Sequence, residues 1–231
     1  MSTYVLVHGA WGGSYGWRQV RPLLQRAGHQ VFTPSLTGQG ERSHLATPEV
    51  NLTTHIKDVT NAIWYEDLTN IILVGHSYGG MVVTGVADQM PERITHLVYL
   101  DAFLPQDGQS LYDLGGGGQR PSGWLVPGPA RGGDPTDPDV QWNAARRVDH
   151  PRATLEEKVH LAAAAESRPF SLTYIQATGR EAGQGGGFFD QCAERLRSNP
   201  RWTVRQISGG HGMIRTNPEG TVRLFQELFP G

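Results

Sequence analysis

The chain has 231 residues with 22 acidic and 20 basic side chains, which give a formal net charge of −2 at pH 7. This length is sufficient for one domain with a substantial hydrophobic core. No run of basic residues occurs, so nucleic acid is not expected as a partner. The single cysteine, Cys192, excludes an internal disulfide and a cysteine-ligated zinc site, and no cluster has metal-ligand spacing.

The first apolar run of the chain, Tyr4–Val7, is too short for a signal peptide or a membrane span and has no basic flank. The sequence therefore predicts a soluble cytoplasmic protein without a membrane partner. The oligomeric state stays open, a homodimer included. Many of the 30 glycines fall in predicted loops, which indicates mobile segments over a rigid frame.

In chain order, short apolar strands alternate with helices. The predicted strands are Tyr4–His8, Val31–Leu36, Ile71–Val74, Ile94–Leu100, Leu172–Ala177 and Thr203–Ile207. The predicted helices are Tyr15–Ala27, Leu52–Asp67, Met81–Ala87, Phe188–Arg197 and Thr216–Phe229, with a polar loop over Thr37–Pro48. This alternation predicts an α/β fold, a mostly parallel sheet of about six strands with helices on both faces. Residues 1–103 and 168–231 form this predicted core.

Residues 104–167 interrupt the strand pattern. They contain a run of four glycines, a segment rich in proline and glycine, and a predicted helix over Thr154–Glu166. A structureless loop of this length is unusual, and a lid over an active site is the common exception. We therefore predict a lid insertion with four apolar residues that either line a pocket or anchor the lid to the core: Trp124, Leu125, Val126 and Trp142.

The central motif is Gly75-His76-Ser77-Tyr78-Gly79, a G-x-S-x-G sequence between a predicted strand and a predicted helix. Such a turn holds the serine at a sharp, strained corner, where the flanking glycines leave room for the chain and for a substrate. The amino end of the following helix favours developing negative charge. We predict that Ser77 is a nucleophile; the alternative is a glycine-rich turn with an idle serine.

A nucleophilic serine requires a base, and His211 is the candidate among nine histidines. It follows the last predicted strand, and its position after Ser77 fits the chain order serine, acid, histidine. His8, Ser77, Asp101 and His211 all come just after predicted strands, at the carboxyl edge where parallel sheets bind ligands.

The acid that orients His211 has three candidates. The usual position follows the strand that ends at Ala177, where Glu181 is the first carboxylate and Asp190 comes later in a helix. Asp101 ends the preceding strand, and neighbouring strand ends both reach the same edge. Asp101 is favoured, while Glu181 and Asp190 stay open.

The oxyanion that forms on a carbonyl needs two donors. In such a turn they are the N–H after the nucleophile, here Tyr78, and an N–H from the loop after the first strand, here Ala10. His8 is predicted to support that loop, and His76 is predicted to pack or to hydrogen-bond beneath the serine turn. The predicted substrate pocket is formed by Trp11, Trp124, Leu125 and Met213.

Several segments together resemble the α/β-hydrolase superfamily: His8–Trp11, Leu36–Ser43, Gly75–Gly80 and Tyr99–Pro105. More narrowly, the chain resembles the branch of plant methylesterases, hydroxynitrile lyases and bacterial pyrethroid-hydrolase-type carboxylesterases. The resemblance implies a Ser77–His211 pair, the backbone donors of Tyr78 and Ala10, and no cofactor. The chain departs from the family pattern because no aspartate soon follows Ala177, and because it begins at the family's third strand.

These features predict a serine carboxylesterase that hydrolyses small to medium hydrophobic esters through an acyl-enzyme, without a metal. The alternatives are a small-molecule receptor on a hydrolase frame, a lyase, or a perhydrolase of the same fold. The lyase relatives carry a lysine directly after the catalytic histidine, where this chain has Gly212. That difference favours ester hydrolysis over cyanohydrin cleavage.

Overall fold

The structure, a computed structural model, describes residues 1–116, 120–129, 134–179 and 186–230. The strands are β1 (Thr3–Val7), β2 (Gln30–Phe32), β3 (Ile71–His76), β4 (Ile94–Leu100), β5 (Leu125–Val126), β6 (His150–Pro151), β7 (Ser171–Ala177) and β8 (Trp202–Ile207). The helices are α1 (Val20–Arg26), α2 (Leu52–Tyr65), α3 (Gly79–Gln89), α4 (Pro138–Ala144), α5 (Ala153–Glu156), α6 (Gly186–Arg197), α7 (Met213–Thr216) and α8 (Pro218–Leu228). Short 3₁₀ helices are η1 (Ser14–Trp17), η2 (Gly40–Leu45), η3 (Pro91–Arg93) and η4 (Ala165–Ser167).

Six parallel strands form the central sheet in the order β2-β1-β3-β4-β7-β8, which confirms the predicted fold class. Every residue of β3 is buried, because helices cover both faces of the sheet. Gly75 near the end of β3 is paired with Val7 of β1 and Tyr99 of β4. The carboxyl ends of these strands therefore lie side by side, and the loops that follow them share one edge.

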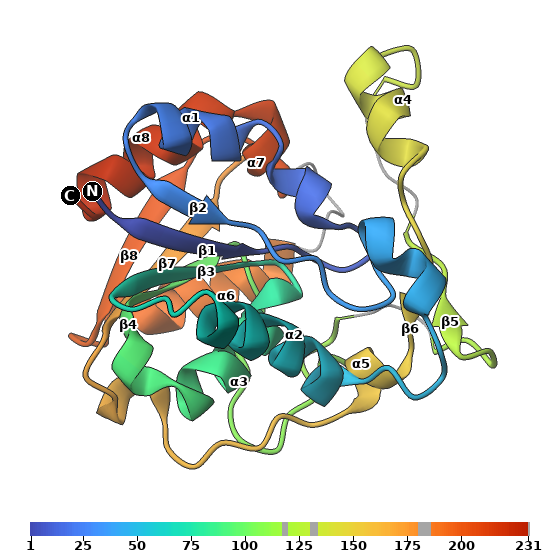
Figure 1. The fold of residues 1–231 in the computed structure, drawn as a ribbon, viewed down its shortest axis with the longest axis horizontal. Helices are drawn as coiled ribbons and strands as arrows, with labels where there is room; N and C mark the ends of the chain where they lie inside the picture. The colour runs from blue at the N-terminus through green and yellow to red at the C-terminus, as the bar shows by residue number, and fades with distance from the viewer. Residues whose placement is uncertain (117–119, 130–133, 180–185, 231) are drawn as a thin grey trace.

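The two faces of the sheet have separate hydrophobic clusters, since successive side chains of a strand point to opposite faces. Tyr4 and Leu6 of β1 pack with the cluster under α1, α7 and α8, whereas Val5 and Val7 pack with the cluster under α2, α3 and α6. Figure 1 shows these two helical layers on either side of the sheet.

Residues 104–167 lie between β4 and β7 and contain the two-stranded ribbon β5–β6 together with α4 and α5. In Figure 1, α4 projects from the body of the molecule near the top right. Asp139 of α4 forms ion pairs with Arg18 at 2.5 Å and with Arg215 of α7 at 2.7 Å. The ring of Trp142 lies between the guanidinium groups of Arg18 and Arg146. These contacts attach α4 of the insertion to the core.

The predicted helix over Thr154–Glu166 is wrong. The helix α5 ends at Glu156, and the following residue has extended backbone. Val159 exchanges backbone hydrogen bonds with residues 108 and 109, and the Asp88 carboxylate accepts the N–H groups of Ala162 and Ala163. These tertiary hydrogen bonds use the groups that a helix would pair internally, so they override the helix propensity of the segment.

Other predicted elements are shorter than expected. The predicted helix over Tyr15–Ala27 is divided into η1 and α1, and Pro22 lies in the first turn of α1, where a missing N–H is tolerated. β2 ends at Phe32, two residues before Pro34, which has no N–H for a sheet. The predicted closing helix Thr216–Phe229 corresponds to α8, which begins at Pro218 because the Asn217 side chain caps it, and the short helix α7 precedes it. The predicted loop Thr37–Pro48 contains η2.

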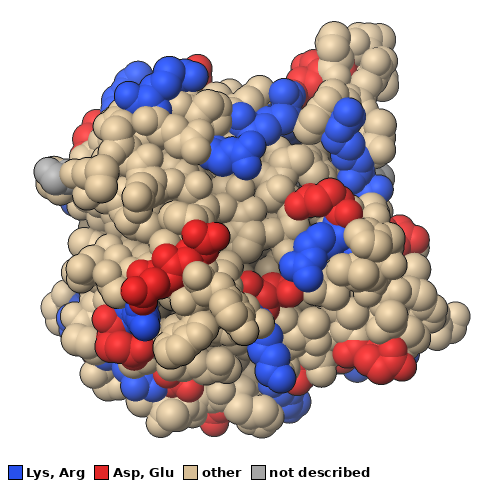
Figure 2. Space-filling model, viewed as in Figure 1, with Lys and Arg blue, Asp and Glu red and all other residues tan. Residues whose placement is uncertain are grey.

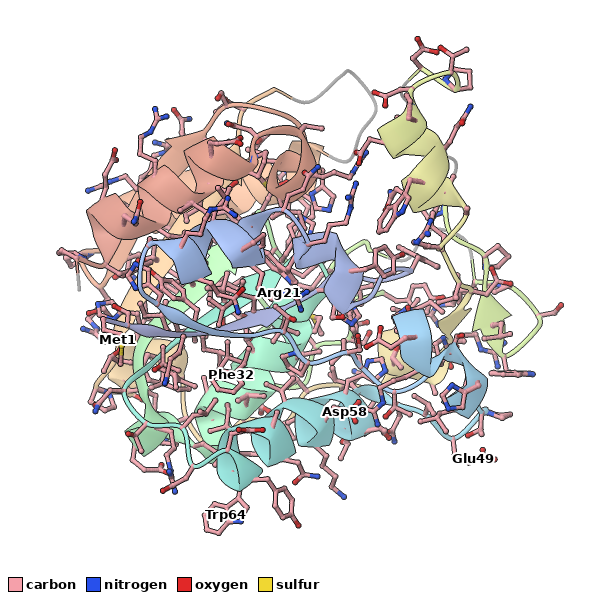
Figure 3. All side chains as sticks on the ribbon, turned by 45° about the horizontal axis from the view of Figure 1, so that its top comes forward. Met1, Arg21, Phe32, Glu49, Asp58 and Trp64 are labelled. Atoms are coloured by element: carbon pink, nitrogen blue, oxygen red, sulfur yellow. The ribbon has the colours of Figure 1, made fainter. Side chains whose placement is uncertain are left out.

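The outer surface combines charged and apolar side chains. Figure 2 shows acidic and basic groups interspersed over a largely uncharged face. Figure 3 shows Trp64 pointing outward from the end of α2, where 61% of it is exposed. Among the residues that the structure describes, no helix is long and apolar enough to cross a membrane.

Candidate active site

Ser77 lies at the turn between β3 and α3 and has a left-handed φ of 55°. That conformation costs an L-residue about 1–2 kcal/mol, so the surroundings must hold it. The Ser77 N–H donates to the Leu100 carbonyl, and the Ser77 carbonyl accepts the N–H groups of Gly80 and Phe103 at 3.0 Å. The end of β4 and the loop after it therefore fix the strained corner at which the serine is presented.

The glycines of the turn are required by close approach. A Cβ at Gly79 would lie 2.7 Å from the Val7 carbonyl oxygen, and one at Gly80 would lie 2.0 Å from the Phe103 carbonyl oxygen. Gly9 has the same constraint, because its Cβ would lie 2.9 Å from the Cβ of Ser77. The chain that leaves β1 thus passes directly beside the serine side chain.

The structure brings Ser77, His211 and Asp101 together. His211 Nε2 lies 2.9 Å from Ser77 Oγ, and His211 Nδ1 lies 2.7 Å from Asp101 Oδ2. A carboxylate only accepts hydrogen bonds, so Nδ1 carries the proton and Nε2 is free to accept the serine hydroxyl. Asp101 is fully buried, and its Oδ1 accepts the N–H of Ala177 from β7. The three side chains therefore form one continuous hydrogen-bonded chain.

Two rings flank the His211 imidazole. His76 donates from Nε2 to the His211 carbonyl at 2.8 Å, and the two rings lie 4.8 Å apart. Phe189 of α6 stacks on His211 with centroids 5.2 Å apart and ring planes 12° apart. His76 was predicted to pack or to hydrogen-bond beneath the serine turn, and its hydrogen bond goes to the backbone of His211. The contribution of Phe189 was not predicted, because the alternation of apolar residues carries no signal for contact with a histidine far along the chain.

The two expected oxyanion donors are the backbone N–H groups of Ala10 and Tyr78. Within the described part of the chain, neither the Ala10 N–H nor the Tyr78 N–H forms a hydrogen bond with another protein group. Trp11, the residue after Ala10, has a φ of 57°, and its own N–H donates to His150 Nδ1 at 3.3 Å. The role of the Ala10 and Tyr78 N–H groups as oxyanion donors stays a prediction.

Three buried histidines lie behind these loops. His8 donates from Nδ1 to the Gly9 carbonyl and accepts the Leu36 N–H at Nε2, so it supports the loop after β1. His55 contacts the Thr37 carbonyl through Nε2 and the Tyr78 hydroxyl through Nδ1, both at 2.8 Å. Burial lowers the pKa of His55 to about 3 and holds that of His150 well below its usual value. All three rings are therefore neutral at neutral pH.

His55 and His150 were not among the predicted site residues. No local pattern in the sequence indicates that two distant histidines meet Tyr78. His150 lies in the insertion but is completely buried. Its ring contacts the rings of Trp11, Tyr78 and His55.

The four predicted pocket residues lie in different surroundings. Trp11 is partly buried, and its Nε1 donates to the Val126 carbonyl at 2.8 Å. Trp124 is 38% exposed, and Leu125 is partly buried in β5. Met213 is fully buried in the hydrophobic cluster under α1, α7 and α8. Of the four, Trp11 is therefore next to an expected oxyanion donor, and a pocket role for the set stays a prediction.

Of the two alternative acids, the structure describes Asp190 and not Glu181. Asp190 accepts a hydrogen bond from Gln176 at 2.6 Å, on the exposed side of α6. Glu181 lies outside the described residues. Among the residues that are described, no group of three or more His, Cys, Asp or Glu side chains has the geometry of a metal site.

Comparison with known proteins connects this geometry to a family. The model of the alpha/beta hydrolase family matches residues 4–224. The chain belongs to the alpha/beta hydrolase family. The resemblance predicted from the sequence motifs is thereby confirmed at the level of the family.

Several curated relatives of this α/β-hydrolase are named esterases. It is 54% identical to the carbendazim hydrolyzing esterase of Nocardioides sp. (strain SG-4G) over 114 residues, which cover 49% of the chain and 47% of the relative. It is 30% identical to methylesterase 2 of Arabidopsis thaliana over 136 residues, which cover 53% and 48% of the two chains. The α/β-hydrolase thus spans about half the length of the curated relatives it matches.

Solved structures match over the whole chain. An extracellular alpha/beta-hydrolase from a Paenibacillus species has a TM-score of 0.79 and 26% identity, with 100% of both chains covered. That structure is described as sharing structural and functional homology with tobacco salicylic acid binding protein 2. A pyrethroid hydrolase has a TM-score of 0.72 over 99% of this α/β-hydrolase and 97% of its own chain; at 17% identity it shows the fold alone.

Proposed function

We propose that this α/β-hydrolase is a serine carboxylesterase. The observation that carries the proposal is the continuous hydrogen-bonded chain from Ser77 Oγ through His211 to Asp101. The esterase names of the carbendazim-hydrolyzing and methylesterase relatives support the same class of reaction. Because one fold hosts many activities, the proposal depends on these side chains and not on the fold.

In the proposed mechanism, Ser77 Oγ attacks the ester carbonyl while His211 Nε2 takes the hydroxyl proton. Asp101 stabilises the resulting imidazolium and keeps Nδ1 protonated. The N–H groups of Ala10 and Tyr78 bind the oxyanion of the tetrahedral intermediate. His211 then gives its proton to the leaving alcohol, and water releases the acid from the acyl-enzyme by the same two steps. Water is the second reactant, and every other group named in these steps is a side-chain or backbone group of this chain.

The proposed substrates are small to medium hydrophobic esters. Beside His211, the rings of Phe103, Phe188 and Phe189 lie 5.0–5.7 Å apart between centroids and form an aromatic cluster. Phe103 also donates its N–H to the Ser77 carbonyl, so the cluster begins next to the nucleophile. Aromatic rings at this position favour an apolar acyl or alcohol group.

The direct test is hydrolysis of p-nitrophenyl esters with acyl chains of increasing length, combined with labelling by a fluorophosphonate. We expect turnover by the wild-type protein, and neither turnover nor labelling by a folded Ser77→Ala variant. Labelling that survives in Ser77→Ala contradicts the nucleophile assignment. A wild-type protein that releases an aldehyde from a cyanohydrin but hydrolyses no ester would favour the lyase alternative.

A further inference from the structure

Trp11 is the point at which the insertion meets the loop of the expected oxyanion donor. Its φ of 57° is left-handed, which a bulky residue adopts only when neighbours hold it there. Its backbone N–H donates to His150 of β6, and its indole Nε1 donates to the Val126 carbonyl of β5. Both of these hydrogen bonds come from the β5–β6 ribbon. The ribbon therefore sets the backbone conformation directly after Ala10.

The hydrogen bond from Trp11 also determines the form of the His150 ring. An imidazole nitrogen that accepts an N–H carries a lone pair, so His150 Nδ1 is unprotonated and the single proton lies on Nε2. Burial lowers the pKa of His150 well below its usual value, in agreement with a neutral ring. At neutral pH the ring is thus a fixed acceptor for the Trp11 N–H.

The other nitrogen of this ring indicates that packing alone does not explain a histidine at position 150. His150 Nε2 is buried and has no hydrogen-bond partner among the described residues. A buried donor without an acceptor destabilises the fold, whereas a phenyl ring would fill similar space without that penalty. The favourable polar interaction that the described structure gives this ring is its bond to Trp11. The feature that histidine adds over an apolar ring is therefore the acceptor at Nδ1.

The ring also touches the second expected donor. The centroids of His150 and Tyr78 lie 4.9 Å apart with planes at 74°, and the Tyr78 hydroxyl bonds to His55 Nδ1 at 2.8 Å. His55 in turn contacts His150 with ring centroids 5.9 Å apart. The buried ring of His150 therefore contacts both Tyr78, whose N–H is one expected donor, and Trp11, which follows the other expected donor, Ala10.

We propose that His150 is a positioning residue of the oxyanion hole: by accepting the Trp11 N–H at Nδ1, it fixes the left-handed turn that aims the preceding Ala10 N–H. The inference rests on the proposed function, since it assigns Ala10 to the oxyanion. It makes the insertion a structural part of the reaction centre, whose ribbon must be in place before the donor is aligned. Preorganised donors matter because they are aimed at the oxyanion before it forms.

The test compares two variants of similar size. The His150→Asn variant keeps an acceptor oxygen on Cγ, near the position of Nδ1, whereas His150→Leu has none. We measure kcat and KM for p-nitrophenyl acetate, the inhibition constant of a trifluoromethyl ketone, which forms an oxyanion in the site, and the melting temperature. The variant His150→Phe keeps a ring of similar volume without an acceptor, so a loss of activity in this variant does not arise from a cavity.

We expect His150→Leu and His150→Phe to lower kcat by about tenfold or more and to weaken the ketone in parallel, with KM nearly unchanged. We expect His150→Asn to recover most of both losses. Wild-type kcat in His150→Leu, or equal losses in the Asn and Leu variants that follow their melting temperatures, overturns the inference alone. If the wild type hydrolyses no ester, or if Ser77→Ala remains active, the proposed function fails and the inference fails with it.

Discussion

Asp101 Oδ2 lies 2.7 Å from His211 Nδ1, although the two residues are 110 positions apart in the chain. Asp101 directly follows β4, and its backbone has a left-handed φ of 46°. Its N–H donates to the Ile175 carbonyl, and its second carboxylate oxygen accepts the Ala177 N–H. β7 thus holds both the backbone and the side chain of this residue. The carboxylate is placed by the sheet and not by a loop.

The first prediction concerns this carboxylate. Asp101→Asn keeps the shape and a hydrogen bond, but its amide N–H favours the His211 tautomer with the proton on Nε2, which cannot accept from Ser77. We expect kcat for a p-nitrophenyl ester to fall by roughly 10³- to 10⁴-fold, with the fold retained by circular dichroism. Asp190→Asn and Glu181→Gln are the matched controls. A comparable loss in either control, with Asp101→Asn active, would assign the acid elsewhere.

The second prediction concerns the turn glycines. Gly80→Ala brings a Cβ to 2.0 Å from the carbonyl oxygen of Phe103, a residue whose N–H donates to the Ser77 carbonyl. We expect the free energy of unfolding, measured by urea denaturation, to fall by about 1–3 kcal/mol or more. The control is Gly187→Ala in α6, where an added Cβ meets nothing within 4 Å. This control should gain up to about 1 kcal/mol from helix propensity, and equal losses in both variants would contradict the steric explanation.

The third prediction concerns the buried histidine His55. Its folded pKa of about 3 lies below the unfolded value near 6.5, so the unfolded chain binds the proton first as the pH falls. The stabilisation from a neutral His55 is therefore complete above pH 6.5 and is lost progressively as the pH falls toward 3.

Between pH 7 and pH 5, this one group should lower the free energy of unfolding by about 2 kcal/mol. His55→Gln retains an amide donor for the Thr37 carbonyl but does not titrate. Urea denaturation of the two proteins at both pH values measures the difference. Equal pH dependence in wild type and His55→Gln would contradict a lowered pKa of His55 in the folded state.

The fourth prediction concerns the attachment of α4. Asp139 bridges Arg18 and Arg215, and partial exposure of these groups limits each pair to at most about 1 kcal/mol. Asp139→Asn should therefore leave the melting temperature almost unchanged but increase proteolytic cleavage close to α4, and added salt should do the same to the wild type. The control is Glu156→Gln, which removes a pair within the insertion. Unchanged cleavage in Asp139→Asn would mean that Trp142 and its arginine neighbours suffice to hold α4 against the core.

The placement of Ser77 and His211 at one edge of the sheet was predictable because the signals of both residues are local. Ser77 lies in a short motif that requires glycines on both sides, and His211 follows the last strand, so chain order and the parallel sheet place them on one edge. The carboxylate that contacts His211 was less certain, since sequence reasoning places the ends of neighbouring strands equally near that edge. Pairing of β4 with β7, and the hydrogen bond from Ala177 to Asp101, place the Asp101 carboxylate at His211.

The sequence by itself determined the six-stranded parallel sheet, because hydrophobic periodicity records which faces are buried. Only the tertiary structure decided the surroundings of the serine: the rings of His76 and Phe189 on His211, and the His55–Tyr78 and His150–Trp11 hydrogen bonds. It also decided that residues 157–164 are not helical. The physical reason is the same in each case: these contacts join residues far apart in the chain, and a long-range hydrogen bond or ring contact leaves no periodic pattern along the sequence.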